Sequence, residues 1–483
     1  MLSALGLLAI VVAPALGALL AYLAKEGPTR SAVLAGSAGL HFALVARLWI
    51  APPGPVMGGW LAVDGLGLIV LSLLSVLFLV VANYAEGFLR GGKLYERRVF
   101  VTGLLTFLSA ASLVSLSHHL ALLWVGMEAT TLSMAPLIYD RHDRRSLEAV
   151  WKYLVLSSVG IAFALLAVFL LATAQPSRAG VRPLVLEDLL AAGARLDHWW
   201  LRAAFVFALV GFGTKMGLAP LHTWKPDTYG EAPSLVGGLM AGGVTTCAFL
   251  GLARFTQVVL AADLGGFARP LLLGFGLFSL AVAAAFIIGQ ADVKRLLAYS
   301  SVEHMGLLSL GLGLGGLGAY GAVLHALNNG LVKALLFLAV GNLVAVSGSS
   351  AAADLRGMLR VRPWSATLAV IGLFAVTGSP PFGMFLSEFT IISGAFREDH
   401  PLVAAAALVL LAVTFVGIAR MILEMILGDA PAPGPGPVDR ERPWMIVGPL
   451  VLAGLVLVLG SWLPEALQEQ LARSATSLGG RAP

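Results

Sequence analysis

Charged side chains are scarce in this sequence. Asp, Glu, Lys and Arg together make up 12% of its 483 residues, against roughly 25% in soluble domains. Hydrophobic residues make up 58%, and the mean hydropathy is +0.90. This balance excludes a soluble globular protein and predicts an all-α polytopic membrane protein. The net charge of +5 fits basic residues at membrane edges, so no nucleic-acid partner is expected.

Cysteine is almost absent, since Cys247 is the single one. One thiol excludes a disulfide within the chain and any metal or iron–sulfur centre held by several cysteines. Cys247 lies in an apolar stretch, where a core residue is the better interpretation. Residues 463–483, after the last apolar stretch, are too few for a catalytic domain. We therefore expect no catalytic site and no metal in this chain.

Long apolar stretches of about 18 to 25 residues predict about fourteen transmembrane helices. The first has no basic region before it and no small-residue cleavage site after it, so we expect a spanning helix and not a signal peptide. The predicted helices start near residues 2, 31, 61, 100, 119, 150, 201, 234, 268, 297, 319, 365, 402 and 444.

Basic residues gather in alternate connections, which the positive-inside rule places in the cytoplasm. Both termini are then expected on the non-cytoplasmic side of the bacterial cytoplasmic (inner) membrane. The basic connections are residues 25–30, 90–98 and 141–152, Lys225, and residues 294–295, 356–362 and 440–442.

One apolar stretch, GFGTKMGLAPLHTWKPDTYGEAPS at residues 211–234, carries Lys215 at membrane depth. A charge there costs roughly 3 kcal/mol or more unless it is hydrated or paired. Pro220 should break this helix and leave backbone carbonyls free near the ammonium, which suits an ion path. His222 follows the break and is either a proton entrance or a helix cap.

A second stretch, at residues 371–396, repeats this arrangement. Pro380 and Pro381 should break it, and Glu388 follows two turns later. Corresponding broken helices in two halves are typical of inverted-repeat transporters. The predicted halves are residues 99–256 (helices 4 to 8) and 257–428 (helices 9 to 13), with broken helices 7 and 12. Residues 1–98 precede them, and a Pro/Gly linker (429–443) and a last helix with a short tail (444–483) follow.

Two neighbouring helices carry polar residues at helical spacing. Ser300 and His304 share one face, which fits proton transfer and a hydrogen-bonded core equally well. His325, Asn329 and Lys333 recur every four residues on the next helix. They predict either a hydrated path or an interhelical hydrogen-bond seam, and the lysine favours the path.

Glu128 stands alone in LALLWVGMEATTLSMAPLI. A buried carboxylate needs a basic partner or water, and Lys215 is the obvious candidate, although Glu128 could simply tie two helices together. Asp64 is interpreted as a cap or interface residue. His118 and the pair Lys152 and Tyr153 are interpreted as residues of the membrane edges.

The motifs WVGMEATTLS, GTKMGLAPLHTWKPDTYGEAPS, DVKRLLAYSSVEHMG, HALNNGLVKALLFLAVGN and GSPPFGMFLSEF occur in this order. With them the chain resembles the proton-conducting antiporter-like subunits shared by respiratory complex I, multisubunit sodium/proton antiporters and membrane-bound hydrogenases. The wording MEATTLS and PPFGMFLSEF is most similar to the F-type subunits of the hydrogenase-4 and formate hydrogenlyase branch.

The resemblance implies that Glu128 pairs with Lys215 and tunes its proton affinity. It also implies that His325 and Lys333 belong to a central hydrophilic axis and that Glu388 leads to the external side. The implied mechanism is electrostatic: when a neighbouring subunit draws Glu128 away, the proton on Lys215 moves to Lys333 and then to Glu388.

The sequence departs from the family pattern at two places. The helix 8 position that is usually lysine or histidine is Thr246, and the second histidine of helix 11 is Asn329. The link between Lys215 and Lys333 must then run through water and hydroxyls, or conduction is impaired.

The resemblance implies a proton-translocating, non-catalytic subunit of a redox-driven complex, most similar to a membrane-bound hydrogenase or formate hydrogenlyase. Its expected partners are other membrane subunits, a peripheral redox arm, the lipid bilayer, and protons or Na⁺. No cofactor is expected in this chain, and NiFe and iron–sulfur centres would lie in partner subunits. The alternatives are a subunit of a sodium/proton antiporter, a non-conducting scaffold, and a membrane partner of a carbon dioxide hydrating system.

Overall fold

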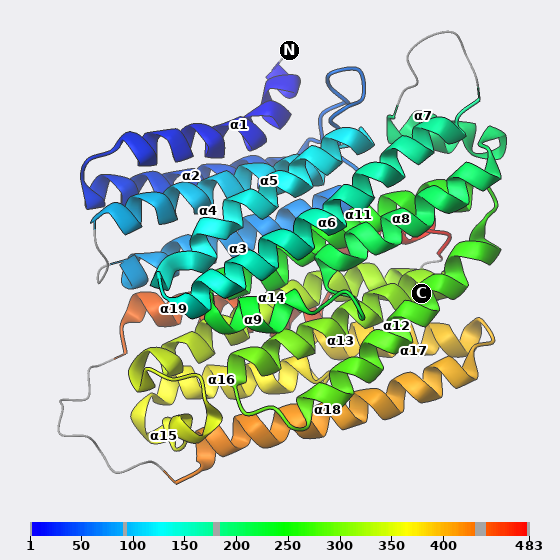
Figure 1. Cartoon of the computed structure of the whole chain (residues 1–483). Coiled ribbons are helices and arrows are strands. Elements are labelled where there is room, and N and C mark those ends of the chain that lie inside the picture. Colours follow the sequence, from blue (N-terminus) through cyan, green and yellow to red (C-terminus); the bar gives the residue numbers. More distant parts are fainter. Residues whose placement is uncertain (1, 90–93, 177–183, 430–440, 481–483) are drawn as a thin grey trace.

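The computed structural model describes residues 2–89, 94–176, 184–429 and 441–480. Most of these residues are helical, and within them only isolated β-bridges occur. The long helices run side by side in one bundle (Figure 1). Eleven helices of the described ranges are long and apolar enough to cross a membrane. The prediction of an all-α polytopic membrane protein is confirmed, whereas the count of fourteen spans and the inverted repeat stay predictions.

The first part of the bundle is built from long, uninterrupted helices. Each predicted start lies within six residues of an observed helix start, the largest shifts being 100 against 94 and 150 against 144. These helices are α1 (Leu2–Leu23), α2 (Gly27–Ile50), α3 (Gly65–Leu89), α4 (Leu94–Leu116), α5 (Leu120–Ile138) and α6 (Arg144–Ala174), followed by the short α7 (Leu186–Ala192).

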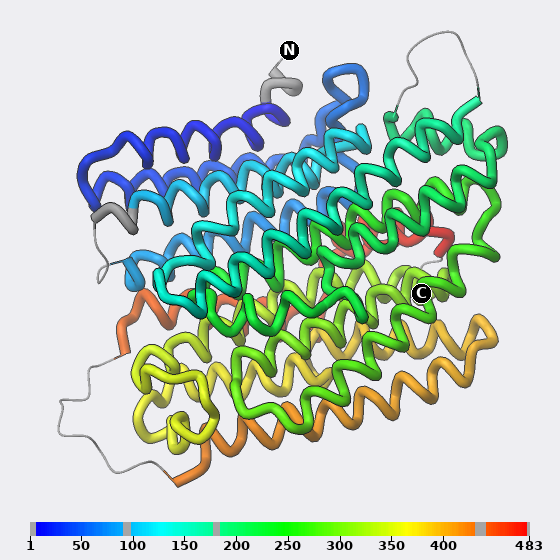
Figure 2. The backbone as a smooth tube through the Cα atoms, viewed as in Figure 1, coloured from blue at the N-terminus to red at the C-terminus, as the bar shows by residue number. Residues whose placement is uncertain are grey.

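The middle and last parts contain the elements that form the candidate site. They are α8 (His198–Met216), α9 (Trp224–Glu231), α10 (Ser234–Leu239), α11 (Thr245–Ala261), α12 (Gly265–Ile287), α13 (Val293–Leu314), α14 (Gly316–Ser347), α15 (Met358–Val361), α16 (Pro363–Val376), α17 (Gly383–Arg397), α18 (Pro401–Leu427), α19 (Pro443–Ser461) and α20 (Glu465–Ser477). In the tube view, α1 and α2 form one edge of the bundle, α18 forms the opposite edge, and the chain from α8 to α14 runs between them (Figure 2).

Two interruptions confirm the predicted helix breaks. The first separates α8 from α9 at residues 217–223 and contains Pro220, and the second separates α16 from α17 at residues 377–382 and contains Pro380 and Pro381. Gly217 ends α8 with φ +81°, and its N–H donates to the carbonyl of Gly213. A left-handed residue at this place is the usual way to stop a helix.

The helical segment formed by α10 and α11, which follows the first break, is also irregular. Residues Met240–Val244 form one π-helical turn that joins α10 to α11, and residues 235–259 around it are all buried. A π-helical turn inserts an extra residue and often occurs at functional sites. Thr246 is the second residue after this turn.

The two ends of the bundle differ in their covering elements. At one end, here called the α7 end, lie the connection 51–64, α7 and α20. At the other, the α15 end, lie α15 and the basic connections 141–152 and 294–295 (Figure 1). α7 forms within the connection between α6 and α8. The short tail after α19 forms α20, which packs against α3 and α14. Most of the predicted linker 429–443 lies outside the described residues.

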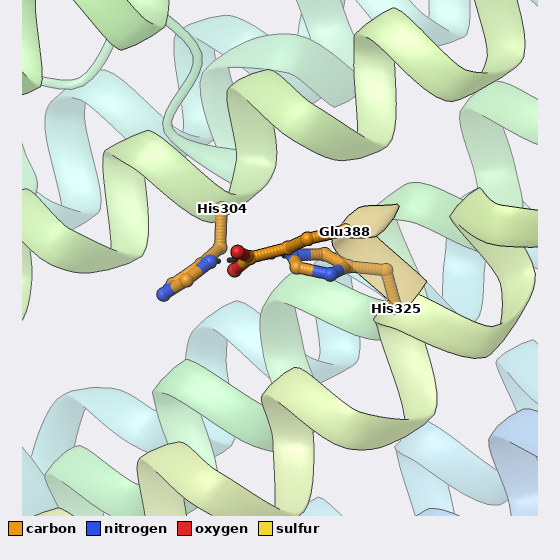
Figure 3. Close-up of side chains that lie close together, drawn as sticks. All are labelled: His304, His325 and Glu388. Atoms are coloured by element: carbon orange, nitrogen blue, oxygen red, sulfur yellow. Dashed lines mark hydrogen bonds between the residues drawn. The ribbon is translucent and has the colours of Figure 1, made fainter. Parts of the chain in front are cut away.

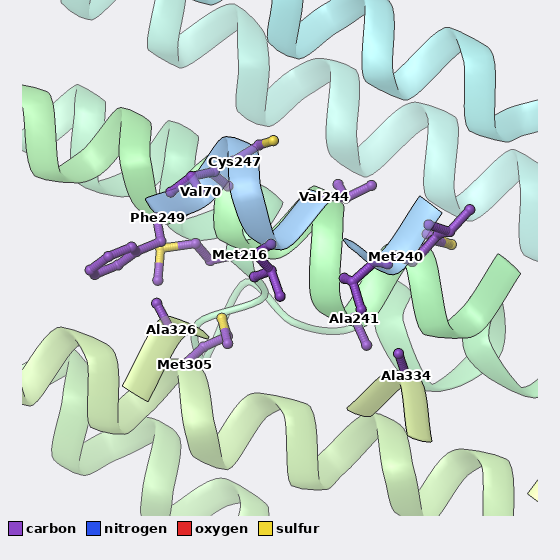
Figure 4. Packing of buried hydrophobic residues seen from close by; sticks show 14 of the residues in the cluster. Val70, Met216, Met240, Ala241, Val244, Cys247, Phe249, Met305, Ala326 and Ala334 are labelled. Atoms are coloured by element: carbon purple, nitrogen blue, oxygen red, sulfur yellow. The ribbon is translucent and has the colours of Figure 1, made fainter. Parts of the chain in front are cut away.

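A single large hydrophobic cluster fills the centre of the bundle. Figure 4 shows part of it, where Met216, Met240 and Cys247 lie among apolar side chains from several helices. Cys247 is fully buried there, which confirms its interpretation as a core residue. Polar side chains inside this cluster therefore stand out against an apolar background.

Candidate functional site

Lys215 lies in the last turn of α8 and is fully buried. Its ammonium donates to Thr131 Oγ1 at 2.8 Å and to Tyr153 OH at 2.9 Å, and Nζ lies 4.6 Å from the centre of the Tyr153 ring. Thr131 belongs to α5 and Tyr153 to α6, so three helices meet at this ammonium. Tyr153 is itself fully buried, which corrects its interpretation as a membrane-edge residue.

Glu128 does not form the expected ion pair with Lys215. Among the described residues, its Oε1 accepts a hydrogen bond from Ser158 Oγ at 3.2 Å, and its buried Oε2 has no hydrogen-bond partner. Lys215 donates to neutral hydroxyl groups instead. The interpretation that Glu128 acts on Lys215 by direct pairing is wrong for this conformation.

Glu128 lies on a face of α5 that the chain itself does not cover. Val125 and Leu132, three residues before and four residues after it, are 47% and 59% exposed. Residues at this spacing share one face of a helix. Glu128 as a residue is only partly buried, so this face of α5 is open to whatever lies beside the bundle.

Lys333 is the second fully buried lysine of the predicted set. It projects from α14 and donates to Ser300 Oγ of α13 at 2.6 Å. Among the described residues, no carboxylate lies within 4.0 Å of the Lys333 ammonium or of the Lys215 ammonium. Neither lysine therefore forms an ion pair within this part of the chain. The polar residues predicted on α14, which include Lys333, thus contact the polar face predicted on α13, which includes Ser300.

The two histidines of these helices are in direct contact. His304 Nδ1 and His325 Nε2 are 3.2 Å apart, and His325 Nδ1 lies 3.0 Å from Ser387 Oγ of α17. Glu388 is next to this serine, and its carboxylate lies within 4.8 Å of a ring nitrogen of each histidine (Figure 3). A hydrogen bond between two imidazoles requires that one of them carries the proton. The cluster can therefore pass a proton between α13, α14 and α17.

The cluster of His304, His325 and Glu388 also has the composition of a metal-binding site. Two imidazole nitrogens and a carboxylate oxygen are a common ligand set for transition metals, and these three side chains bring such atoms together. The absence of a metal from this chain stays a prediction. The hydrogen bond from His325 to Ser387 would fix the ring orientation in either case.

Three predicted accessory residues do not join this network directly. Thr246 donates to the carbonyl of Gly242 in its own helix at 2.7 Å. Asn329 is fully buried, but its amide has no hydrogen-bond partner among the described residues. His222 lies in the α8–α9 break, 6.2 Å from the Tyr299 ring. The neighbour Asn328 instead donates to the carbonyl of Gly383 at the start of α17.

Sequence reasoning missed several buried ionisable residues, and two of them, Glu303 and Lys225, lie beside this network. Glu303 of α13 is 3% exposed, and Thr414 of α18 donates to its Oε1 at 2.5 Å. Its position next to His304 inside an apolar stretch is the signal that could have found it. Lys225, interpreted as a basic residue of a cytoplasmic connection, is fully buried. The reason for this error is that α9 re-enters the bundle after the break.

At the α15 end, a cavity of about 700 Å³ opens beside α9. Asp227 of α9 accepts hydrogen bonds there from Lys152 at 2.7 Å and from Arg295 at 2.9 Å. The cavity is lined mainly by charged groups, among them Arg141, Glu231 and Asp292. Water can therefore reach the outer turn of α9 from this end.

At the α7 end, a second charged cluster surrounds Asp64. Fully buried Arg254 donates to both oxygens of Asp64, at 2.6 and 2.7 Å. His118 Nδ1 lies 2.6 Å from Glu187 Oε1, and its Nε2 lies 3.6 Å from Asp64. Asp64 also accepts from the N–H of Gly67, so it is a cap as predicted, whereas His118 is buried and not a snorkelling edge residue.

This cluster fixes the charge states of its members. Burial alone would raise the pKa of Asp64, but the Arg254 guanidinium and its hydrogen bonds hold that pKa well below its usual range. Burial alone would lower the pKa of His118, whereas the carboxylates of Asp64 and Glu187 raise it above the ordinary value. The hydrogen bond to His118 lowers the pKa of Glu187. The cluster ties α7 to α3 and α11.

Replacing Arg254 with leucine is expected to lower the thermal stability of the purified protein. Breaking a buried ion pair costs about 3–5 kcal/mol, and we expect roughly 2–3 kcal/mol here because Asp64 is 30% exposed. Because the pKa of folded Asp64 lies below its unfolded value, the pair contributes fully above about pH 4. The Tm of the variant should therefore fall equally at about pH 6 and pH 8. An unchanged Tm, or a loss at only one of these pH values, would contradict the assigned charge states.

Comparison with known proteins identifies the chain. The family described as NADH:quinone oxidoreductase/Mrp antiporter, transmembrane, matches residues 117–414. The chain belongs to this family. The match runs from the start of α5 into α18 and so includes every member of the network described above. The family membership expected from the sequence motifs is confirmed.

Two hydrogenase-4 components are among the proteins to which this chain is similar in sequence. The hydrogenase-4 component F homolog of Methylacidiphilum infernorum is 35% identical over 65% of this chain and 66% of its own length. Hydrogenase-4 component B of Escherichia coli is 30% identical over 87% of this chain and 65% of its own. The chain thus spans about two thirds of the length of these relatives.

A solved structure supports the fold. A chain of the archaeal membrane-bound sulfane sulfur reductase superimposes with a TM-score of 0.88 at 21% identity, over 98% of both chains. At this identity the likeness establishes the shared arrangement of helices.

Proposed function

We propose that this chain carries protons across the membrane as the antiporter-like subunit of a redox-driven, hydrogenase-type complex. The observation that carries the proposal is the pairing of Lys215 and Lys333 with neutral hydroxyl groups in the interior. Burial without a counter-charge disfavours the charged form of an amine. Each lysine is therefore suited to accept and release a proton, which a permanent ion pair would prevent.

Glu128 supplies the control in this mechanism. Its exposed face is expected to lie against a neighbouring membrane subunit, because a carboxylate facing lipid would cost several kcal/mol. A charge from that subunit can hold Glu128 away from Lys215 or release it. An ion pair at about 4 Å in an environment of intermediate polarity amounts to about 4 kcal/mol. This exceeds the roughly 2.3 kcal/mol needed to move one charge against 100 mV.

The proton leaves through the second half of the chain. From Lys333 the hydroxyl of Ser300 leads along α13 towards His304, which shares a hydrogen bond with His325. Glu388 stands beside this histidine pair, at the second helix break. We assign uptake to the charged cavity at the α15 end and release to the side reached through Glu388. By the distribution of basic residues, uptake is cytoplasmic and both termini lie on the opposite side of the inner membrane.

The hydrogenase-type assignment is supported by the two hydrogenase-4 relatives. Electron transfer would occur in partner subunits that hold NiFe and iron–sulfur centres, because this chain supplies a single thiol. A peripheral redox arm and further membrane subunits complete the proposed assembly. The sodium/proton antiporter alternative needs no redox partner.

The test is to purify the complex from its native host in mild detergent and to identify every co-purifying chain by mass spectrometry, with metal analysis of the same sample. Nickel together with iron–sulfur subunits is the expected result. An assembly of membrane subunits alone, free of nickel and iron, would overturn the redox assignment and favour the antiporter. Purification after a high-salt wash controls for loosely adhering proteins.

A further inference from the structure

Lys225 is a buried lysine to which the family resemblance assigns no role. It lies at the start of α9, is fully buried, and donates to Ser301 Oγ of α13 at 2.9 Å. Among the described residues it has no ion pair, and its Nζ lies 5.9 Å from the centre of the Tyr229 ring. Its charge is therefore balanced by a hydroxyl and an aromatic face only.

Lys225 binds the same turn of α13 that Lys333 contacts. Lys333 donates to Ser300, and Lys225 donates to the next residue, Ser301. Cα atoms of consecutive residues are about 3.8 Å apart. Two ammonium groups from α9 and α14 thus bind adjacent hydroxyls of α13, and their mutual repulsion favours a state in which one of them is neutral.

On its other side, Lys225 packs against the end of the helix that carries Lys215. A Cβ atom at Gly217 would lie 2.4 Å from Lys225 Cδ and 3.0 Å from Nζ, so only glycine leaves room for this side chain. The neighbouring Trp224 donates from its indole N–H to the carbonyl of Thr214 at 2.8 Å and holds α9 against α8. Lys225 therefore stands between the two lysines of the proposed path.

We infer that Lys225 is the middle proton relay of this chain, placed on α9 directly after the first helix break and not on α11, the helix that carries Thr246. This inference rests on the proposed proton-conducting function. A proton from Lys215 reaches the amine of Lys225 through water in the break. Lys225 then gives a proton to the Ser301 and Ser300 hydroxyls, which pass one on to neutral Lys333. No electron moves and no covalent bond to carbon changes.

The relay accounts for the two departures from the family pattern. Thr246 bonds to its own helix and offers no titratable group, and Asn329 cannot exchange a proton at neutral pH. Lys225, which reaches α13 from α9, supplies the titratable group that α11 lacks at Thr246. The alternative is that Lys225 only ties α9 to α13.

The experiment compares Lys225→Leu, Lys215→Met and the unmodified complex in proteoliposomes, with proton translocation measured per electron transferred. Lys225→Leu is expected to reduce translocation about tenfold or more, because a positioned proton-transfer group contributes at least that much. Lys294→Met is the matched control. Lys294 is also buried, but it donates to the carbonyls of Gly230 and Ala232, a structural role, so translocation per electron should persist.

A relocated lysine separates a relay from a structural tie. The double variant Lys225→Leu with Thr246→Lys should regain translocation, because it places a titratable group on α11. If Lys225 only ties α9 to α13, this lysine would not restore the lost contact. If Lys225→Leu does not assemble, Lys225→Gln and Ser301→Ala are used, which keep side-chain volume and are expected to slow translocation.

Translocation that is normal in Lys225→Leu or Lys225→Gln but lost in Lys215→Met would overturn the inference and leave the proposed function standing. Normal translocation in all of these variants, Lys215→Met included, would overturn the proposed function itself. Loss in Lys225→Leu without rescue by Thr246→Lys, together with normal translocation in Ser301→Ala, would assign Lys225 a purely structural role.

Discussion

Replacing Lys215 with methionine is expected to reduce proton translocation by the assembled complex about 100-fold or more. Methionine fills the space of the lysine stem but carries no proton. The hydroxyls of Thr131 and Tyr153, which now accept from the ammonium, would hydrogen-bond to each other or to water. Translocation is measured in proteoliposomes by quenching of a pH-sensitive dye, normalised to the amount of assembled complex.

Arg202→Met is the matched control for this variant. Arg202 lies on the same helix, α8, but at its exposed outer end. It should leave translocation unchanged, which shows that loss of a basic residue from α8 is harmless by itself. Normal translocation by an assembled Lys215→Met complex would remove Lys215 from the path and with it the first step of the mechanism.

Replacing Lys333 with methionine is expected to have an effect of similar size, about 100-fold. Lys333 is the last lysine before the histidine pair, and its ammonium is held by Ser300 in a fully buried place. Without it, protons that reach Ser300 lose the amine that accepts them in the proposed path. Electron transfer by the partner subunits should continue at a rate that depends less on the membrane potential, which is read from turnover with and without an ionophore.

The same measurement on Glu388→Gln tests the step after the histidine pair, with Glu398→Gln as its control. Both carboxylates belong to the α17 region, but Glu398 lies at the exposed end of that helix. We expect Glu388→Gln to behave like Lys333→Met and Glu398→Gln to behave like the unmodified complex. Equal behaviour of the two glutamine variants would place the exit elsewhere.

The sequence was sufficient to indicate the buried lysines and the helix breaks of the proposed path. The free-energy cost of burying a charge or breaking a helix makes such residues recognisable in an apolar stretch. A lysine in a long apolar stretch stands out whatever its neighbours are, and so do the prolines that break α8–α9 and α16–α17. The four-residue spacing on α14 likewise requires His325 and Lys333 to share a face. Such features depend on local periodicity and on the cost of burying a charge.

Partners across helices could not be predicted in the same way. Nothing in the sequence indicates that Tyr153 turns inward to accept from Lys215, or that Arg254 crosses the interior to reach Asp64, because these contacts depend on the rotation of each helix. Lys225 was misread for a related reason. A basic residue shortly after a helix break resembles a cytoplasmic connection, and only the return of α9 into the bundle shows that it is buried.

The measurement that tests the account most directly is the number of protons translocated per electron in Lys215→Met, in Lys333→Met and in the double variant. If both lysines act in series on one path, the three complexes should show the same low ratio, because removing either lysine already blocks the path and removing the second has no further effect. A ratio in the double variant well below that of either single variant would show two parallel paths. A ratio equal to that of the unmodified complex in either assembled single variant would contradict the account.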